Sequence, residues 1–345
     1  MQLKSVRKNY PVDDSGTKSI VVTGGAGLIG SAIIWGLNRR NFNKIWLIDD
    51  WSEDTIKSKN VQNLLFNRKL GVDEFRELVR QNSSDLQEIN TIFHLGACSS
   101  TTETNEDFLH DNNFIYTKEL CEWSLNQEVR FIYASSASTY GDGSLGMDDE
   151  MEEIENLKPL NPYARSKQKF DLLAKEQKWL DRIVGLKYFN VFGPNEQHKQ
   201  EMRSLVSKAF EQIALSGEMT LFKSYDSNFA DGEQMRDFLY VKDAVDMTIW
   251  LAENMDACGI FNLGSGKART WLDLANSIFS SMQKETQIKF VEMPLYIRDK
   301  YQYFTEAKIS KLKATGFDNK QHSLEEAVND YVKNYLEPEL HLSLP

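Results

Sequence analysis

The chain has 345 residues, of which 41% are hydrophobic and 26% are charged, and its formal net charge is −11 at pH 7. This composition is typical of a globular protein with a substantial core, and the length suggests one large domain or two coupled lobes. The acidic balance argues against a nucleic-acid partner, because binding to phosphates needs a basic surface.

The three cysteines, Cys98, Cys121 and Cys258, are an odd number at wide spacing. They predict neither a disulfide framework nor a metal site, and they favour a reducing compartment. No apolar run approaches the roughly 18 residues of a membrane span, and the first residues lack the apolar stretch of a signal peptide. We therefore expect a cytoplasmic protein with no metal and no membrane partner.

In chain order, residues 1–17 are polar and predict an extension outside the core. The stretch "KSIVVTGGAGLIGSAIIWGLNRR" then predicts an apolar strand, a glycine turn and an amphipathic helix. Four later segments also predict strands, with helical patterns between them: "NKIWLIDD", "NTIFHLGA", "VRFIYASS" and "DRIVGLKYFNVFG". Strands that alternate with helices imply right-handed crossovers. The predicted fold class is α/β, a Rossmann-type doubly wound parallel sheet.

After Gly193 the alternation breaks, and residues 195–235 are polar and loop-like. "RDFLYVKDAVDMTIWLAEN" restores a strand and a helix, and "GIFNLGSG" predicts a further short strand. We expect a dinucleotide-binding Rossmann domain of residues 18–193 plus about 236–264. A smaller C-terminal substrate-binding lobe would comprise residues 194–235 plus about 265–335.

The glycine turn has the spacing of a dinucleotide fingerprint, with Gly24, Gly27 and Gly30 three residues apart. It follows an apolar strand and opens a helix, which is the context that the fingerprint requires. The first glycine permits a tight turn, the second lets backbone N–H groups approach a pyrophosphate, and the third lets the helix pack on the strand.

The acidic end of the next predicted strand bears on the choice between NAD and NADP. Asp49 is placed to bond the ribose 2′-hydroxyl of NAD and to repel the 2′-phosphate of NADP, and Asp50 strengthens the repulsion. Lys57 and Lys59 follow closely, and either could neutralise a 2′-phosphate. These residues leave the choice open.

The stretch "NPYARSKQKFD" places Tyr163 four residues before Lys167, on one face of a predicted helix. Taken alone, such a pair is usually an ordinary aromatic beside a solvated lysine. Together with "TGGAGLIG" and "YASSASTYG", however, "YARSK" resembles the extended short-chain dehydrogenase/reductase superfamily from Ser19 onward. The resemblance implies a catalytic set of Ser136, Tyr163 and Lys167, with Ser135 as the alternative serine.

The chemistry of such a set is proton transfer coupled to hydride transfer. Tyr163 would take a hydroxyl proton, and the Lys167 ammonium would lower the pKa of the phenol and hold the nicotinamide ribose. Ser136 would hydrogen-bond the reacting oxygen.

Five further motifs are more specific: "HLGACSSTTE", "FNVFGPNEQHK", "RDFLYVKDA", "GIFNLGSG" and "KYQYFTEA". They resemble the family of ADP-L-glycero-D-manno-heptose 6-epimerases, isomerases that invert C6 of an ADP-heptose for the lipopolysaccharide core. The resemblance implies a cytoplasmic homo-oligomer, with a pentamer suggested, and one tightly bound NADP per subunit, with NAD as the alternative. Cofactor contacts are implied for Leu28, Ile29, Leu95, Gly96, Ala97, Cys98, Ser99, Asn112 and Val191. Substrate contacts are implied for Asn190, Lys199, Glu201, Lys208, Phe222, Lys223, Ser224, Tyr225, Arg236 and Tyr301.

The chain departs from that family at four of these positions. Where this chain has Leu95 the family usually has Glu, and where it has Asp50 the family usually has Asn. The positions at which the family contacts its substrate through a serine and a histidine are Glu201 and Lys208 in this chain. Lys199 is implied as a second proton-handling group, with a phosphate clamp as the alternative.

Three alternative functions remain open from the sequence. A UDP-sugar 4-epimerase would use the same residues. A 4,6-dehydratase would need an acidic pair where the chain has Ala137 and Ser138. A non-catalytic dinucleotide sensor would not need the Ser-Tyr-Lys set.

Overall fold

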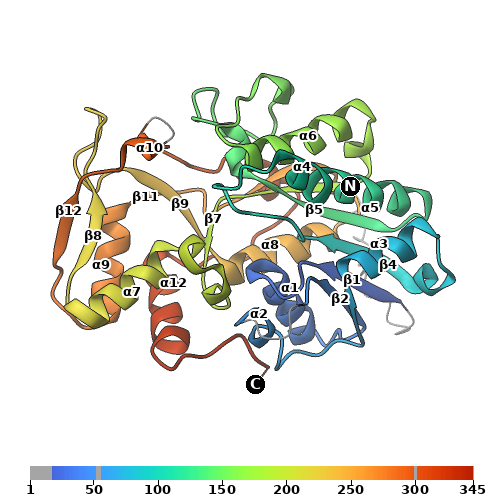
Figure 1. Cartoon of the computed structure of the whole chain (residues 1–345), viewed down its shortest axis with the longest axis horizontal. Helices are drawn as coiled ribbons and strands as arrows, with labels where there is room; N and C mark the ends of the chain where they lie inside the picture. Colours follow the sequence, from blue (N-terminus) through green and yellow to red (C-terminus); the bar gives the residue numbers. More distant parts are fainter. Residues whose placement is uncertain (1–17, 52–55, 299–300, 345) are drawn as a thin grey trace, which may run out of the picture.

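The computed structural model describes residues 18–51, 56–298 and 301–344 (Figure 1). The predicted extension of residues 1–17 lies outside these ranges. The largest sheet in the described part of the chain has seven parallel strands in the order β10-β6-β5-β4-β1-β2-β3. Their bounds are β1 Ser19–Thr23, β2 Ile45–Asp49, β3 Arg68–Gly71, β4 Ile89–His94, β5 Arg130–Ser136, β6 Val184–Tyr188 and β10 Gly259–Leu263. Since the chain winds outward in both directions from β1 and β4, the predicted Rossmann-type fold class is confirmed.

Helices cover both faces of this sheet because successive strand side chains point to opposite faces. Ile20 and Val22 of β1 belong to one core with helices α1 and α8, whereas Val21 belongs to the other core with α3, α5 and α6. The bounds of these helices are α1 Leu28–Arg39, α3 Val72–Arg80, α5 Tyr116–Asn126, α6 Pro162–Glu176 and α8 Val241–Glu253. Strands buried on both faces are continuous apolar runs, which is why the sequence pattern revealed β1 and β2.

The sequence analysis missed β3, which lies at the edge of the sheet and pairs with β2 alone. Its sequence is RKLG, and Leu70 is its one buried residue. An edge strand that buries a single side chain has no hydrophobic pattern from which it could be recognised.

Residues 195–235 contain more regular structure than their polar sequence suggested. Strand β8 (Met219–Phe222) follows helix α7 (Leu205–Ser216) and pairs with β12 (Ile288–Val291). Strand β9 (Met235–Tyr240) pairs with β7 (Asn190–Phe192) and β11 (Ala268–Thr270) in a separate sheet. Figure 1 shows β8, β12, α7 and α9 at one end of the molecule, away from the seven-stranded sheet. The other helices are α2 Ile56–Lys59, α4 Glu106–Leu109, α9 Trp271–Ser281, α10 Leu295–Arg298, α11 Ser310–Ala314 and α12 Leu324–Tyr331.

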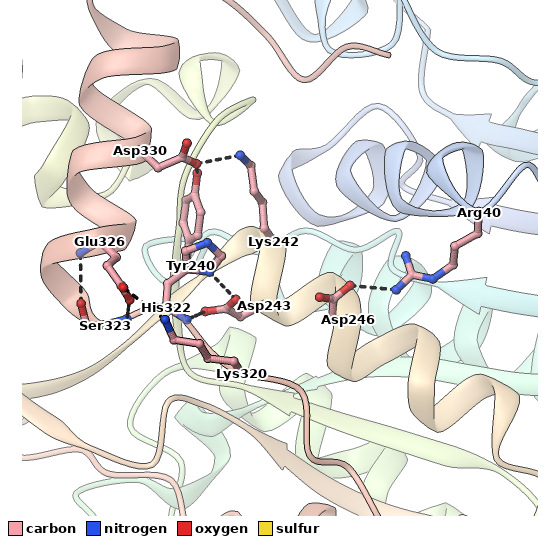
Figure 2. Close-up of polar contacts among 10 residues, drawn as sticks. All are labelled: Arg40, Tyr240, Lys242, Asp243, Asp246, Lys320, His322, Ser323, Glu326 and Asp330. Atoms are coloured by element: carbon pink, nitrogen blue, oxygen red, sulfur yellow. Dashed lines mark hydrogen bonds and ion pairs between the residues drawn. The ribbon is translucent and has the colours of Figure 1, made fainter. Parts of the chain in front are cut away.

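Polar contacts join the start of α8 to α12 and to the residues just before α12 (Figure 2). The Tyr240 hydroxyl and the Lys242 ammonium both bond to the carboxylate of Asp330 on α12. The backbone N–H of His322 donates to Asp243 at 3.0 Å, and its Nδ1 lies 2.7 Å from the same carboxylate. Helix α8 therefore contacts the sheet on one side and α12 on the other.

In the described ranges, no helix combines the length and the apolar character that crossing a membrane requires.

Candidate active site

A cavity of about 1010 Å³ opens at the carboxyl ends of β1, β2, β4, β5 and β6. This is the point at which the strand order reverses, where open α/β sheets bind their ligands. Many predicted site residues line it: Gly24, Gly27, Leu28, Ile29, Gly30, Asp49, Asp50, Lys57, Leu95, Gly96, Ala97, Cys98, Ser99, Asn112, Ser136, Tyr163, Lys167, Val191 and Lys199. The structure thus brings every expected cofactor residue except Lys59, and the four expected catalytic residues, to one cavity. Lys59 is exposed and is not among the lining residues.

The glycine turn between β1 and α1 has the geometry that its spacing predicts. Gly24 has φ +64°, and a Cβ there would lie 2.7 Å from the backbone of Gly96. A Cβ at Gly30 would lie 2.1 Å from the carbonyl oxygen of Gly24, so only glycine lets the helix pack against the turn. No side chain caps the first turn of α1, where Gly27 is the N-cap. The positive end of the helix therefore faces the cavity and suits a pyrophosphate.

Asp49, at the end of β2, is buried and supports the glycine turn. Its carboxylate accepts the backbone N–H of Ala26 at 2.8 Å and of Asp50 at 2.7 Å, and it forms an ion pair with Lys57. The negative charge at this end of the cavity is therefore partly neutralised by a lysine that also lines it.

A π-helical turn at residues 110–115, between α4 and α5, brings two asparagines to the cavity side. Asn112 lines the cavity. Asn113 is buried and bonds both backbone groups of Cys98, at 2.9 Å and 3.0 Å, and also the Ser166 hydroxyl of α6 at 2.9 Å. Single π turns within helices often occur at functional sites. Here the turn fixes the loop after β4 against α6.

Tyr163 and Lys167 lie one turn apart at the start of α6. Asn161 caps the helix by accepting the backbone N–H of Ala164 at 2.8 Å, and Pro162 occupies the first turn. Both features are typical of helix N-termini. Ser136 ends β5, its hydroxyl lies 2.8 Å from that of Ser138, and it is close enough to Tyr163 to lower the pKa of the phenol. The Ser-Tyr-Lys set is therefore assembled by one strand end and one capped helix.

The pKa values of this set differ from the sequence-based expectation. Burial raises the pKa of Tyr163, and the nearby Ser136 hydroxyl opposes that rise. Burial also lowers the pKa of Lys167 to about 8, with the charge of Asp171 opposing the change. Lys167 is therefore still mostly protonated at pH 7. The structure does not show the lowered tyrosine pKa that we expected, because desolvation of the phenol dominates.

Asp171 lies one turn beyond Lys167 and settles which of the two consecutive serines faces Tyr163. Its buried carboxylate accepts the hydroxyl of Ser135 at 2.7 Å and that of Tyr133 at 2.9 Å. Lys187, also buried, lies 3.5 Å from it. The Ser135 hydroxyl is thus bonded to α6, and Ser136 is the serine beside Tyr163.

Lys199 belongs to a 3₁₀ segment at residues 197–202, just after β7, and lines the cavity with His198. Burial lowers the pKa of Lys199, and the nearby charge of Glu196 opposes that change. Burial likewise lowers the pKa of His198 to about 4, so that its imidazole is neutral near pH 7. The sequence analysis did not include His198.

The remaining predicted substrate residues do not line this cavity: Asn190, Glu201, Lys208, Phe222, Lys223, Ser224, Tyr225, Arg236 and Tyr301. Arg236 is buried between the rings of Trp271 and Tyr301, 5.6 Å and 5.0 Å from their centroids, and bonds the Met235 carbonyl. Lys223 and Tyr225 instead contact Glu292. Lys208 bonds the backbone carbonyl of Glu201.

The cavity, the uncapped helix and the Ser-Tyr-Lys set define a Rossmann-type protein that binds a nicotinamide dinucleotide. The model of the NAD dependent epimerase/dehydratase family matches residues 20–264. The chain belongs to that family.

Individual relatives agree with this assignment. A protein of Nitratidesulfovibrio vulgaris (strain DP4) named ADP-L-glycero-D-manno-heptose-6-epimerase is 47% identical over 317 residues, which cover 92% of this chain and 97% of the relative. A protein of Fusobacterium nucleatum with the same name is 45% identical over 93% of this chain and 98% of the relative. The crystal structure of the Helicobacter pylori enzyme of that name has the same fold, with a TM-score of 0.75 at 24% identity, and covers 94% of this chain and 98% of the other.

Proposed function

We propose that the protein interconverts ADP-D-glycero-D-manno-heptose and ADP-L-glycero-D-manno-heptose by transient oxidation and re-reduction at C6. The observation that carries the proposal is the Ser136–Tyr163–Lys167 set at the edge of a dinucleotide cavity. Relatives of nearly equal length are named for this reaction. The product would serve the heptose part of the lipopolysaccharide core.

A nicotinamide cofactor held by the glycine turn and Lys167 would supply the hydride chemistry, which is removal of hydride from C6 and its return to the other face of the ketone. Tyr163 takes the proton of the C6 hydroxyl and gives it back, and Ser136 holds the reacting oxygen. Because burial raises the pKa of Tyr163, the ionised phenol needs positive charge beside it. Lys167, one turn away and still mostly protonated at pH 7, supplies that charge from the chain.

Lys199 is proposed as the second proton-handling group, for the orientation of the intermediate that Tyr163 does not reach. It lines the same cavity, and burial moves its pKa down toward the working range.

Arg236 is proposed to bind a phosphate of the ADP moiety. Its guanidinium is buried near two aromatic rings and donates a hydrogen bond to the Met235 carbonyl at 2.8 Å. A buried guanidinium with spare donors suits bidentate phosphate binding.

We propose NADP as the cofactor, with NAD as the alternative, and Lys57 as the counter-charge of the 2′-phosphate. Lys57 lines the cavity and pairs with Asp49, whereas Lys59 does not line it. Mass spectrometry of the nucleotide released from freshly purified protein decides between the two, and NAD alone would overturn the choice. Light scattering on the same sample tests the proposed homo-oligomer.

The reaction is tested by incubating the protein with ADP-D-glycero-D-manno-heptose and following the sugar protons by NMR. Appearance of the L-glycero isomer without added cofactor supports the proposal. UDP-glucose is the comparison substrate, because a 4-epimerase would convert it and leave the ADP-heptose unchanged.

A further inference from the structure

Residues 337–344 return from α12 to the dinucleotide end of the molecule, and the end marked C in Figure 1 lies beside α1 and α2. Leu342 is 1% exposed and belongs to the same core as α1. The Ser343 carbonyl accepts the indole N–H of Trp35 at 3.1 Å. This segment carries no residue of the proposed reaction, and residues 337–340 are exposed, yet Leu342 and the Ser343 carbonyl anchor its end to α1.

Asn60, directly after α2, contacts this segment and both walls of the cavity. Its amide nitrogen lies within hydrogen-bond distance of the Ala26 carbonyl in the glycine turn (2.8 Å), the Asn195 carbonyl (3.0 Å) and Nδ1 of His198 (3.1 Å). Its amide oxygen lies 3.1 Å from Nδ1 of His341. Asn60 is fully buried, so these contacts are shielded from water.

Asn195 makes a second link between the same parts of the chain. Its side-chain oxygen accepts the backbone N–H of Leu342 at 3.0 Å, and its amide nitrogen donates to the Ser31 hydroxyl of α1 at 2.9 Å. Asn195 is fully buried and has φ +76°, a backbone conformation that residues other than glycine adopt less often. The contacts with Leu342 and Ser31 support this conformation.

The chemistry of the Asn60 amide oxygen fixes the direction of its contact with His341. An amide oxygen can only accept, so Nδ1 of His341 carries a proton and donates to Asn60. The Asn60 amide nitrogen has two N–H groups for three neighbours, which are the carbonyls of Ala26 and Asn195 and Nδ1 of His198. The lowered pKa values of both histidines, caused first by burial, agree with uncharged rings near pH 7.

What these contacts hold in place is the wall of the cavity. Lys57 precedes Asn60 by three residues and pairs with Asp49, and His198 and Lys199 follow Asn195. We propose that Asn60, Asn195 and His341 are positioning residues through which residues 341–343 hold α2 and the 195–199 loop around the cofactor. The inference rests on the proposed function, because it takes the cavity as a dinucleotide site. Weakening the contact should loosen cofactor binding while the sheet stays folded.

The test compares full-length variants stripped of nucleotide. His341→Phe keeps a ring of similar shape and removes the donor to Asn60, whereas His341→Asn keeps an N–H close to the position of Nδ1. We expect His341→Phe to raise the Kd for NADP and NAD by about 10-fold or more in calorimetry, which is about 1.4 kcal/mol of binding free energy. Hydrogen–deuterium exchange should quicken in residues 56–61 and 195–199. His341→Asn should restore both properties, and Leu340→Ala, at a neighbouring exposed side chain, should change neither.

A second variant, Asn60→Ala, removes the same link from the other side and should give the same pattern. A Kd within twofold of the wild-type value in both variants would overturn the proposal, even if the thermal midpoint fell, because the contact would then be purely structural. If the wild-type protein bound neither nucleotide, the proposed function would fail. The exchange rates of residues 195–199 would then still decide whether residues 341–343 hold the loop.

Discussion

At the scale of single residues, burial shifts the pKa values of Tyr163 and Lys167 in opposite directions. Burial acts on both groups and disfavours the charged form of each, raising the pKa of the tyrosine and lowering that of the lysine to about 8. The charge of Asp171, one further turn along α6, opposes the lowering of the Lys167 pKa. Ionisation of the Tyr163 phenol therefore depends on the nearby charge of Lys167, because burial removes the water that would otherwise solvate the ionised phenol.

Replacing Tyr163 by Phe should abolish turnover and leave the cofactor bound. The ring packs equally well without its hydroxyl but cannot exchange a proton, so we expect kcat to fall by on the order of 100-fold or more. Kinetics by NMR and absorbance of the bound nucleotide measure the two effects. Near-normal turnover in Tyr163→Phe would leave this residue with a packing role only.

Replacing Lys199 by Met separates its two possible roles. If Lys199 is a second proton-handling group, its loss should lower kcat by about 100-fold and should weaken substrate binding much less. If it is a phosphate clamp, its loss should mainly raise KM. Steady-state kinetics on the ADP-heptose distinguish the two, and an unchanged kcat with a raised KM would leave Tyr163 to act alone.

At the scale of elements, Asp237 joins strand β9 to two loops that are distant in sequence. Its buried carboxylate accepts the backbone N–H groups of Ser265 (2.6 Å), Gly266 (2.9 Å) and Ala307 (3.0 Å) and the Ser265 hydroxyl (2.8 Å). Burial raises the pKa of Asp237, and these hydrogen bonds oppose the rise. The strand that carries Arg236 is therefore held by one side chain that satisfies three backbone donors.

Asp237→Asn should destabilise the protein markedly, because an amide nitrogen would face backbone donors and leave them unpaired. Each buried unpaired group costs about 1–3 kcal/mol, so we expect the free energy of unfolding to fall by about 2–4 kcal/mol. The matched control is Asp246→Asn, which breaks an exposed pair with Arg40 (Figure 2) and should cost about 1 kcal/mol at most. Urea unfolding of both variants measures the difference, and equal losses would contradict the argument.

At the scale of the whole molecule, the sequence predicted what depends on local pattern. The glycine turn is contained in fewer than a dozen residues, so its spacing between a strand and a helix indicated it. The spacing of Tyr163 and Lys167 was not sufficient alone, and the resemblance of the surrounding motifs to a known family gave the pair its meaning. Strand β3 was not predicted because an edge strand needs few apolar residues. The role of Asn60 was not predicted because its partner His341 is 281 positions away, and no local pattern can indicate such a contact.

The same separation of 281 positions between Asn60 and His341 sets an order in the synthesis of the protein. A ribosome adds about 5–20 residues per second, so residues 341–343 are synthesised on the order of 10–60 s after the glycine turn and α2. Until then the cofactor cavity lacks the contacts that hold its wall. The glycine turn and the seven strands of the sheet therefore precede residues 341–343 in synthesis, and they can fold before these contacts form.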